Sequence, residues 1–160
     1  MGKVLSRFEN GFSGAVSRSI DNVIVSMKNG SDGEIPFGAP VFQQAGQNAC
    51  LPFAAATSTS EKFLGFAVRE AVKTPEEYGS NEGVFRGDYL VEVLVRGSAV
   101  LTFAGTAAPG SPVYIRKEDG ALVTAAGTEG TTLLLPNVTV RAPADSAHCA
   151  EVVVTKRNLM

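Results

Sequence analysis

The stretch YLVEVLVRGSAVLTFAG, residues 89–105, carries the strongest structural signal in the chain. Every second position holds a valine, with other residues between: Val91, Val93 and Val95 alternate with Glu92, Leu94 and Arg96. A period of two predicts a β-strand with one buried face. Gly97 interrupts the pattern before AVLTF continues it. The segment therefore predicts a long β region and directs the interpretation of the rest of the chain.

A five-residue pattern of glycine, small residue, proline, valine and aromatic residue occurs twice. GAPVF occupies residues 38–42 and GSPVY occupies residues 110–114. Each copy predicts a bend, a strand, a turn and a return strand, because the residue before a proline is pushed toward extended geometry. Two explanations stay open: chance recurrence of a hairpin pattern, or a duplicated β-unit with approximate internal symmetry. Under either explanation the motif shapes the backbone and carries no chemistry.

Turn signals separate short apolar segments along the remainder of the chain. NGSDG at residues 29–33 predicts a turn, and Asp119-Gly120 predicts a tight hairpin turn. Gly65 inside FLGFAV predicts a bulge or a close backbone approach, and Pro136 predicts an edge, a bulge or a strand start. Many short strands with frequent turns predict an all-β fold, a small β-barrel or sandwich, for a body that spans residues 21–160.

The first twenty residues differ from this body and predict an extended N-terminal arm, residues 1–20. Apolar side chains stand at nearly helical spacing there, but Gly11 and Gly14 each cost about 1 kcal/mol relative to alanine in a helix. We expect an arm that becomes ordered only against a partner, and the alternative is a terminus that packs on its own domain. The candidate partner-binding residues are Arg7, Phe8, Phe12, Val16, Arg18 and Ile20.

A second region also breaks the strand pattern. KTPEEYGSNEGVFRGD, residues 73–88, contains a proline, three glycines and charges of both signs. Loops of this length in a compact domain are usually functional or mobile. We therefore expect a long surface loop over residues 73–88.

The composition limits the possible partners. The 160 residues suit one domain with an appendage, and a formal net charge of -2 gives no field that attracts nucleic acid or an acidic membrane. No stretch approaches the roughly 20 apolar residues of a membrane span, and no signal peptide is recognisable. We expect a protein made in a reducing cytosol, without direct nucleic-acid or membrane partners, in which Cys50 and Cys149 are free thiols.

The sequence shows no active-site motif. His148 precedes Cys149 directly, but neighbouring positions on a strand face opposite sides of a sheet, which argues against a catalytic pair. Glu34, Asp88 and Glu92 would form a carboxylate site only if the fold brought them together. One histidine and two distant cysteines also lack the spacing of a zinc site. We predict no catalytic, cofactor-binding or metal-binding residue, and hence a structural or binding protein.

The order of motifs resembles that of the cement or decoration proteins of tailed-bacteriophage capsids. The resemblance covers residues 11–125 and rests on GFSGAVSRSI, IPFGAPVF, FLGFAVRE, GDYLVEVLVRGSAVLTF and PGSPVYIRKEDGALV, in that order. It implies a small β-barrel-like domain on the virion exterior that binds the major capsid protein and reinforces the shell. It implies no catalytic residue.

Two functions follow as expectations. The first is a capsid cement protein, made in the host bacterial cytoplasm, that also self-associates on the capsid lattice. The second is a receptor- or glycan-binding β-module of a fibre or adhesin. The absence of tryptophan disfavours the second function, because sugar binding commonly uses exposed aromatic rings.

Overall fold

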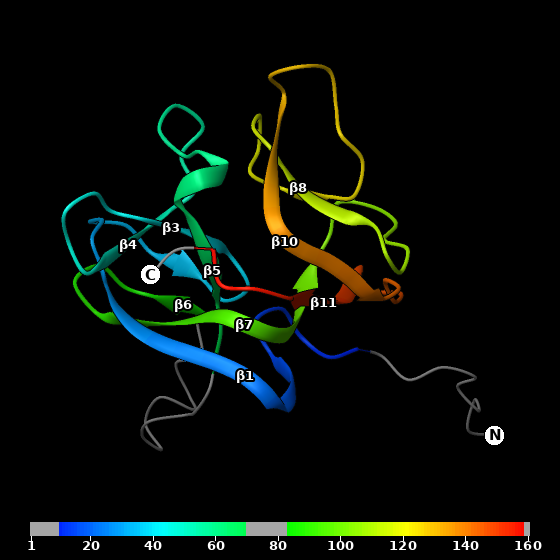
Figure 1. The fold of residues 1–160 in the computed structure, drawn as a ribbon, viewed down its shortest axis with the longest axis horizontal. Helices are drawn as coiled ribbons and strands as arrows, with labels where there is room; N and C mark the ends of the chain where they lie inside the picture. The colour runs from blue at the N-terminus through cyan, green and yellow to red at the C-terminus, as the bar shows by residue number, and fades with distance from the viewer. Residues whose placement is uncertain (1–9, 70–82, 159–160) are drawn as a thin grey trace.

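The computed structural model describes residues 10–69 and 83–158, and within them the fold is all-β (Figure 1). One short 3-10 helix, η1 (Ser60–Lys62), is the only helical element in these residues. The strands are β1 (Val16–Asn29), β2 (Ile35–Pro36), β3 (Pro40–Gln43), β4 (Ala49–Pro52), β5 (Phe63–Ala67), β6 (Val84–Phe85), β7 (Leu90–Thr102), β8 (Pro112–Arg116), β9 (Leu122–Val123), β10 (Thr132–Ala142) and β11 (Cys149–Val154). The all-β prediction is confirmed.

Nine strands form one sheet in the order β1-β4-β3-β5-β7-β11-β10-β8-β9, and β2 pairs separately with β6. β1 also pairs with β7, so the first five strands of this order form a ring of pairings. The ring is closed between β1 and β4 only at Lys28 and Asn29. Of the two predicted architectures, a sandwich-like fold fits this large sheet, and a closed barrel does not.

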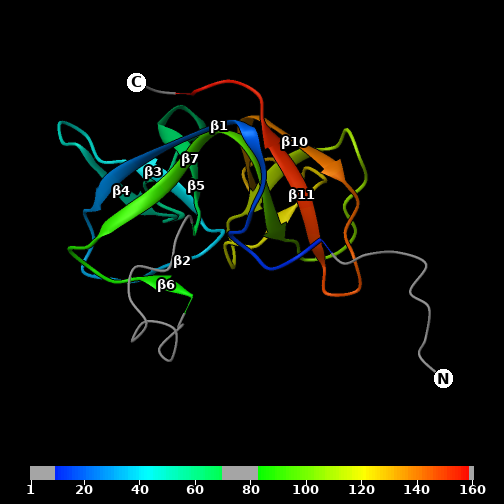
Figure 2. The ribbon, with the colours of Figure 1, turned by 90° about the horizontal axis from the view of Figure 1, so that it is seen from below.

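Strand β7, which contains the valine alternation of the sequence, lies beside β1 and β11 (Figure 2). Its side chains contribute to two hydrophobic cores. Its first half places Val91, Val93 and Val95 in a core enclosed by the ring of strands, together with Met27 and Leu64. Its second half contributes to the other core. That core contains Phe42, Phe63, Phe66, Leu101 and the inward side chains of β8, β10 and β11. The alternation therefore predicted the first core correctly, and the continuation after Gly97 serves the second.

The two proline motifs have the same backbone structure. Gly38 and Gly110 have φ values of 83° and 84°, and each strand begins at the following proline. The Gly38 N–H donates to the Ala67 carbonyl at 2.6 Å, and the Gly110 N–H donates to the Val140 carbonyl at 2.8 Å. In each unit the first strand lies between its return strand and a third strand. In the first unit β3 lies between β4 and β5, and in the second β8 lies between β9 and β10. This matched geometry favours a duplicated β-unit over chance recurrence.

Three local predictions are confirmed by the backbone. Gly120 has φ 72° in the turn between β8 and β9, where the Asp119 carboxylate accepts from Arg116 and from the Ala121 N–H. The hydrogen bond from Arg116 is the main cause that lowers the pKa of Asp119 to about 2. A side chain at Gly65 would overlap the backbone of β7, and Pro136 lies where the register between β10 and β8 shifts.

Two predicted boundaries are wrong. β1 begins at Val16, so the last five residues of the predicted arm are the start of the first strand, where Val16 and Arg18 pair with β7. Composition alone could not reveal this pairing, because it depends on a strand far along the chain. In the predicted loop, Val84–Phe85 form β6, which pairs with β2. Residues 73–82 of that loop, like residues 1–9 of the arm, lie outside the described residues.

Candidate functional site

The described residues contain no cluster of side chains suited to holding a metal ion. No set of three or more His, Cys, Asp or Glu side chains comes together within them. His148 lies in an exposed turn with φ 60°, whereas Cys149 is buried in β11. The carboxylate of Asp88 pairs with Lys28 at 2.9 Å. No helix in the described ranges has the length and apolar character needed to cross a membrane.

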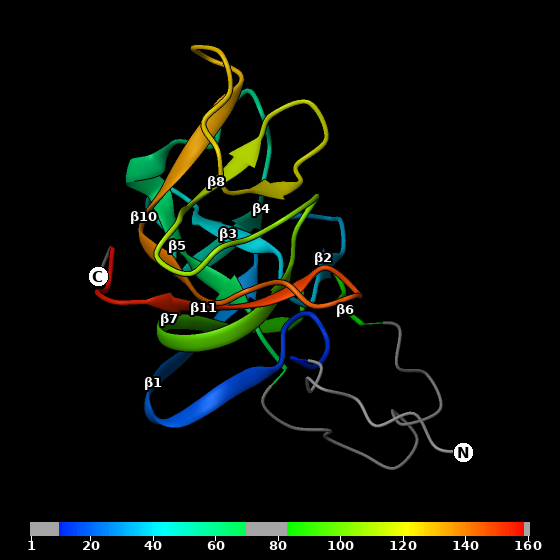
Figure 3. The same cartoon turned by 90° about the vertical axis from the view of Figure 1, so that its right-hand side faces the viewer.

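Residues 10–15 instead form a strap that is hydrogen-bonded to the body on both sides (Figure 3). The Asn10 N–H donates to the Asp145 carboxylate at 2.8 Å, and the Asn10 Nδ2 donates to the carbonyls of Pro143 and Cys149 at 2.9 and 2.7 Å. Asp145 also accepts from the Cys149 N–H at 3.0 Å. The first described residue of the chain is therefore fixed to the connection between β10 and β11.

The other end of the strap contacts the first proline motif and β7. The Gly14 N–H donates to the Val100 carbonyl at 2.8 Å, and the Gly14 carbonyl accepts from the Arg69 N–H at 3.0 Å. Ser13 Oγ donates to the Phe37 carbonyl at 3.3 Å. Gly14 has φ 85°, and a Cβ there would stand 2.7 Å from the Phe37 Cβ, so only glycine fits. Part of the predicted arm thus belongs to the folded domain.

Arg18 and Ser17 connect the start of β1 to Glu151 on β11. The Arg18 Nε lies 2.8 Å from one Glu151 oxygen, and Ser17 Oγ donates to the same carboxylate at 2.9 Å. Burial raises the pKa of Glu151, but hydrogen bonds from Arg18 and Ser17, together with the charges of Arg18 and Arg141, lower it below its ordinary value overall. The Arg18 side chain is therefore paired with Glu151 at the surface of the domain.

Ile20 stands at the top of an arch in β1. Arg18 pairs with Ser98 on β7, and the next pair joins Val23 to Arg96. β1 therefore has more residues between these two pairs than β7 has, and the extra residues bulge outward. Ile20 is 101% exposed, the highest exposure among the large apolar side chains of the described residues. A large apolar side chain that is ordered and wholly exposed is a feature of interaction surfaces.

The arch is held in place by specific contacts. The Asn22 Oδ1 accepts from the Ser98 N–H at 3.0 Å, and Asp21 pairs with Arg96 at 2.9 Å. Gly97 has φ 120°, and any side chain there would overlap Asn22. These contacts hold the residues that follow Ile20, and the contacts of Ser17 and Arg18 with Glu151 hold the residues that precede it. The side chain is therefore presented without the entropy cost of ordering a flexible segment on binding.

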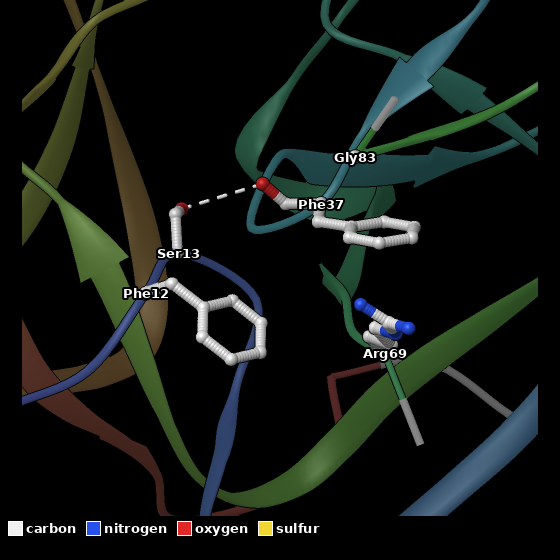
Figure 4. Close-up of a pocket in the computed structure, with 5 residues that line it drawn as sticks. All are labelled: Phe12, Ser13, Phe37, Arg69 and Gly83. Carbon is white, nitrogen blue, oxygen red and sulfur yellow. Dashed lines mark hydrogen bonds between the residues drawn. The ribbon is translucent and has the colours of Figure 1, made fainter. Parts of the chain in front are cut away.

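Phe12 lines a surface hollow at the other end of this region. The hollow has a volume of about 340 Å³, and its described lining consists of Phe12, Ser13, Phe37, Arg69 and Gly83 (Figure 4). The Phe12 side chain is 57% exposed at its edge. The Phe37 ring packs against Phe85 with the ring centroids 4.9 Å apart. The hollow offers aromatic faces beside a guanidinium group, and no cluster of catalytic groups surrounds it.

The structure separates the six candidate residues into three groups. Phe12 and Ile20 are exposed. Val16 is partly buried against the core, and Arg18 pairs with Glu151 while its side chain stays 57% exposed. Arg7 and Phe8 lie outside the described residues. Sequence reasoning did not identify the structural roles of Asn10 in the strap and of Asn22 in the arch. Gly97, a glycine inside a strand pattern, was the signal that could have indicated the arch, because it lies against Asn22.

Comparisons with known proteins complete the description. A family model described as structural cement protein (E217 gp24/Pam3 gp6) matches residues 3–155. No curated protein sequence matches the chain. Among solved structures, a chain in the capsid of Myoviridae phage XM1 is similar, with a TM-score of 0.71, 22% identity and 96% of each chain covered. A chain of the head fibre gp8.5 N base of bacteriophage phi29 is more distant, with a TM-score of 0.45, 9% identity and coverage of 86% of this chain and 99% of that one.

Proposed function

This chain belongs to the structural cement protein family of phages, and on that premise we propose that it binds the outer surface of the capsid through the major capsid protein. Its capsid-stabilising structural role follows from the family, whose model matches residues 3–155. The resemblance drawn from the order of motifs is thereby confirmed. The family match also favours this role over a receptor- or glycan-binding module.

The observation that carries the proposed binding mode is the arch at Ile20. Burying an isoleucine side chain contributes roughly 1.5–3 kcal/mol, and in the free protein this side chain is fully exposed. Phe12 supplies a second exposed apolar group, and Arg7 and Phe8 extend the proposed contact set toward the N-terminus. Each contact is modest, but a protein that also self-associates on a lattice gains from multivalency, because later binding events become intramolecular.

The same premise supports a protein without enzymatic activity, made in the cytoplasm of the host and incorporated into the virion. A cement protein needs a stable fold and a complementary surface, and it needs no reactive group. The internal contacts of Glu151, Asp88 and Asp145 are consistent with charged groups that serve the fold.

The test uses capsid shells assembled without this protein and the purified full chain. Co-sedimentation gives the binding constant, and the temperature at which shells rupture gives the stabilisation. We expect wild-type protein to raise the rupture temperature and Ile20→Ser to bind at least tenfold more weakly. Leu134→Ser is the matched control, because Leu134 is also an exposed aliphatic residue but lies on β10. We expect Leu134→Ser to bind within twofold of wild type.

Two results contradict the proposal. If shells bind Ile20→Ser as tightly as wild type while both variants keep their melting temperatures, the arch is not a contact. If wild-type protein neither binds shells nor raises their rupture temperature, binding to the shell surface itself fails. Images of native particles distinguish the alternative, since a cement protein covers the shell and a fibre module is confined to fibres.

A further inference from the structure

We infer that the free edge of β1 between Val23 and Met27 is a docking site for a β-strand, and that its occupant is residues 1–9 of a second copy of this chain. The inference deepens the proposed self-association by naming the surface and the segment. It begins from an incompletely paired strand. β1 pairs with β7 along one edge, whereas β4 pairs with its other edge only at Lys28 and Asn29.

The edge faces outward in the fold. Figures 1 and 3 both show β1 on the outside of the sheet beside β7. Among residues 10–69 and 83–158, no backbone hydrogen bond reaches the second edge of β1 over residues 23–27. Val23 and Val25 pack against the core enclosed by the ring of strands, yet they are only half-buried. Their partial exposure agrees with an opening between β1 and β4.

The direction of the backbone groups follows from one hydrogen bond. The Asn29 N–H donates to the Tyr89 carbonyl at 2.8 Å, so Asn29 points toward β7. In an antiparallel pair the hydrogen-bonded positions alternate. The register is regular from Ile24 onward, and the N–H and C=O groups of Ile24 and Ser26 therefore point away from β7. These four groups are the donors and acceptors that an added strand requires.

The stretch also lacks the usual protection of an edge. Native proteins protect edge strands with charges, prolines, bulges or covering segments. In β1 the arch at Ile20 covers one end and β4 covers the other. The residues between them, VIVSM at 23–27, include no charge and no proline. An unprotected apolar edge promotes non-specific association, and a specific covering strand would prevent it.

Residues 1–9, MGKVLSRFE, have the pattern that this edge would accept. As a strand, the segment would place Val4, Ser6 and Phe8 on one face and Lys3, Leu5, Arg7 and Glu9 on the other. The first face suits the half-buried Val23 and Val25, and the second, mostly charged, suits solvent. Nine extended residues span roughly 30 Å, which exceeds the length of the open edge. Reciprocal exchange between two copies would close the assembly with two-fold symmetry.

The acceptor side is tested by Ser26→Pro with Ser26→Ala as its control. Both variants remove the Ser26 hydroxyl that donates to Glu92, but only proline removes the outward N–H. The donor side is tested by Phe8→Ser with Leu5→Ser as its control, because the two positions lie on opposite faces of the strand. Sedimentation equilibrium of the purified full-length proteins measures self-association, and circular dichroism checks the fold.

We expect wild-type protein to form dimers, and we expect Ser26→Pro and Phe8→Ser each to weaken them at least tenfold. Both controls should stay within twofold of wild type. A mixture of Ser26→Pro and Phe8→Ser should form one-to-one complexes, since the first keeps its donor segment and the second keeps its edge. Amide exchange of residues 23–27 should slow as the wild-type concentration rises. If Ser26→Pro does not fold, the donor variants and amide exchange decide.

Several outcomes overturn the inference. A wild-type protein that stays monomeric at the highest attainable concentration excludes exchange between copies. If Phe8→Ser then also lowers the stability of the monomer, the segment folds back on its own chain, and the inference fails as well. Equal dimerisation of Phe8→Ser and Leu5→Ser excludes the named segment. If all variants are monomeric and only Ser26→Pro loses shell binding, the edge accepts a capsid strand instead. Sedimentation equilibrium and amide exchange need no shells, so the inferred self-association can fail independently of the proposed function.

Discussion

The two proline motifs provide a controlled test of what the strap contributes to stability. Gly38 and Gly110 have nearly the same φ and begin equivalent strands, but their surroundings differ. A Cβ at Gly110 would have no neighbour within 4 Å. A Cβ at Gly38 would overlap Ser13 Oγ and would stand 3.0 Å from the Gly14 backbone nitrogen. Alanine therefore imposes the same backbone strain at both sites, but it creates a steric conflict only at Gly38.

The magnitudes follow from these two contributions. Alanine in the left-handed region costs about 1–2 kcal/mol at either site. At Gly38, overpacking adds about 1–3 kcal/mol, because Gly14 is held by Val100 and Arg69 and cannot move freely. For a domain of this size 1 kcal/mol corresponds to about 2–4 °C in melting temperature. We expect Gly110→Ala to lower the melting temperature by about 2–8 °C. Gly38→Ala should lower it further, by about 2–12 °C more, because of the added overpacking.

Thermal unfolding followed by far-ultraviolet circular dichroism measures the melting temperature of both variants. A double mutant separates the steric part: Ser13→Gly removes the overlapping hydroxyl, so it should restore part of the stability lost in Gly38→Ala and none of that lost in Gly110→Ala. Equal losses for the two alanine variants, or no interaction between Ser13→Gly and Gly38→Ala, would refute the claim that the strap packs tightly on this turn.

Three further predictions concern other parts of the fold. Gly65→Ala should cost about 3 kcal/mol or more in urea unfolding, because its methyl group would overlap the Leu94 carbonyl, and a smaller loss would mean that β5 and β7 can separate easily. Glu151→Gln should lower stability at pH 7 by about 1–2 kcal/mol. Since the folded pKa of Glu151 is lowered, its contribution is present above its ordinary pKa and is lost as pH falls through the folded value, so the difference in stability between wild type and variant should shrink as the pH falls below the ordinary glutamate range, which unfolding at a series of decreasing pH values can check. Burial raises the pKa of Cys50 to about 11, so iodoacetamide at pH 8 should not alkylate it in the native state, and rapid labelling would show that the ring of strands opens.

Local signals in the sequence predicted much of the sheet correctly. The alternation in residues 89–105 identified β7, and the two proline motifs identified β3 and β8. Gly65, Gly120 and Pro136 were each assigned a backbone role that the structure bears out. These predictions succeeded because period-two burial, positive φ and the missing proline N–H are properties of a few adjacent residues.

The candidate contact residues differ in how the fold engages them, and the sequence did not predict that difference. Ile20 and Phe12 were named from composition, and both are exposed. Val16 and Arg18 were named on the same grounds, yet they are engaged with the core and with Glu151. Composition identifies apolar and basic residues, but it does not show which of them find partners far along the chain. The separation in sequence between Arg18 and Glu151 is beyond the reach of any local pattern.

The sequence by itself determined the all-β class, the places where the chain turns and, through the order of its motifs, the family. Only the tertiary structure decided that residues 10–15 are a strap from the β10–β11 connection to β7 and Phe37. It also decided that β1 arches at Ile20 and that the edge of β1 stays open beyond β4. Turns and strand periodicity arise from steric restrictions within each residue and its neighbours, so they can be read locally. The strap, the arch and the open edge arise from hydrogen bonds between segments that only the complete fold brings together, such as those from Asn10 to the Asp145 region and from Ser98 to Asn22.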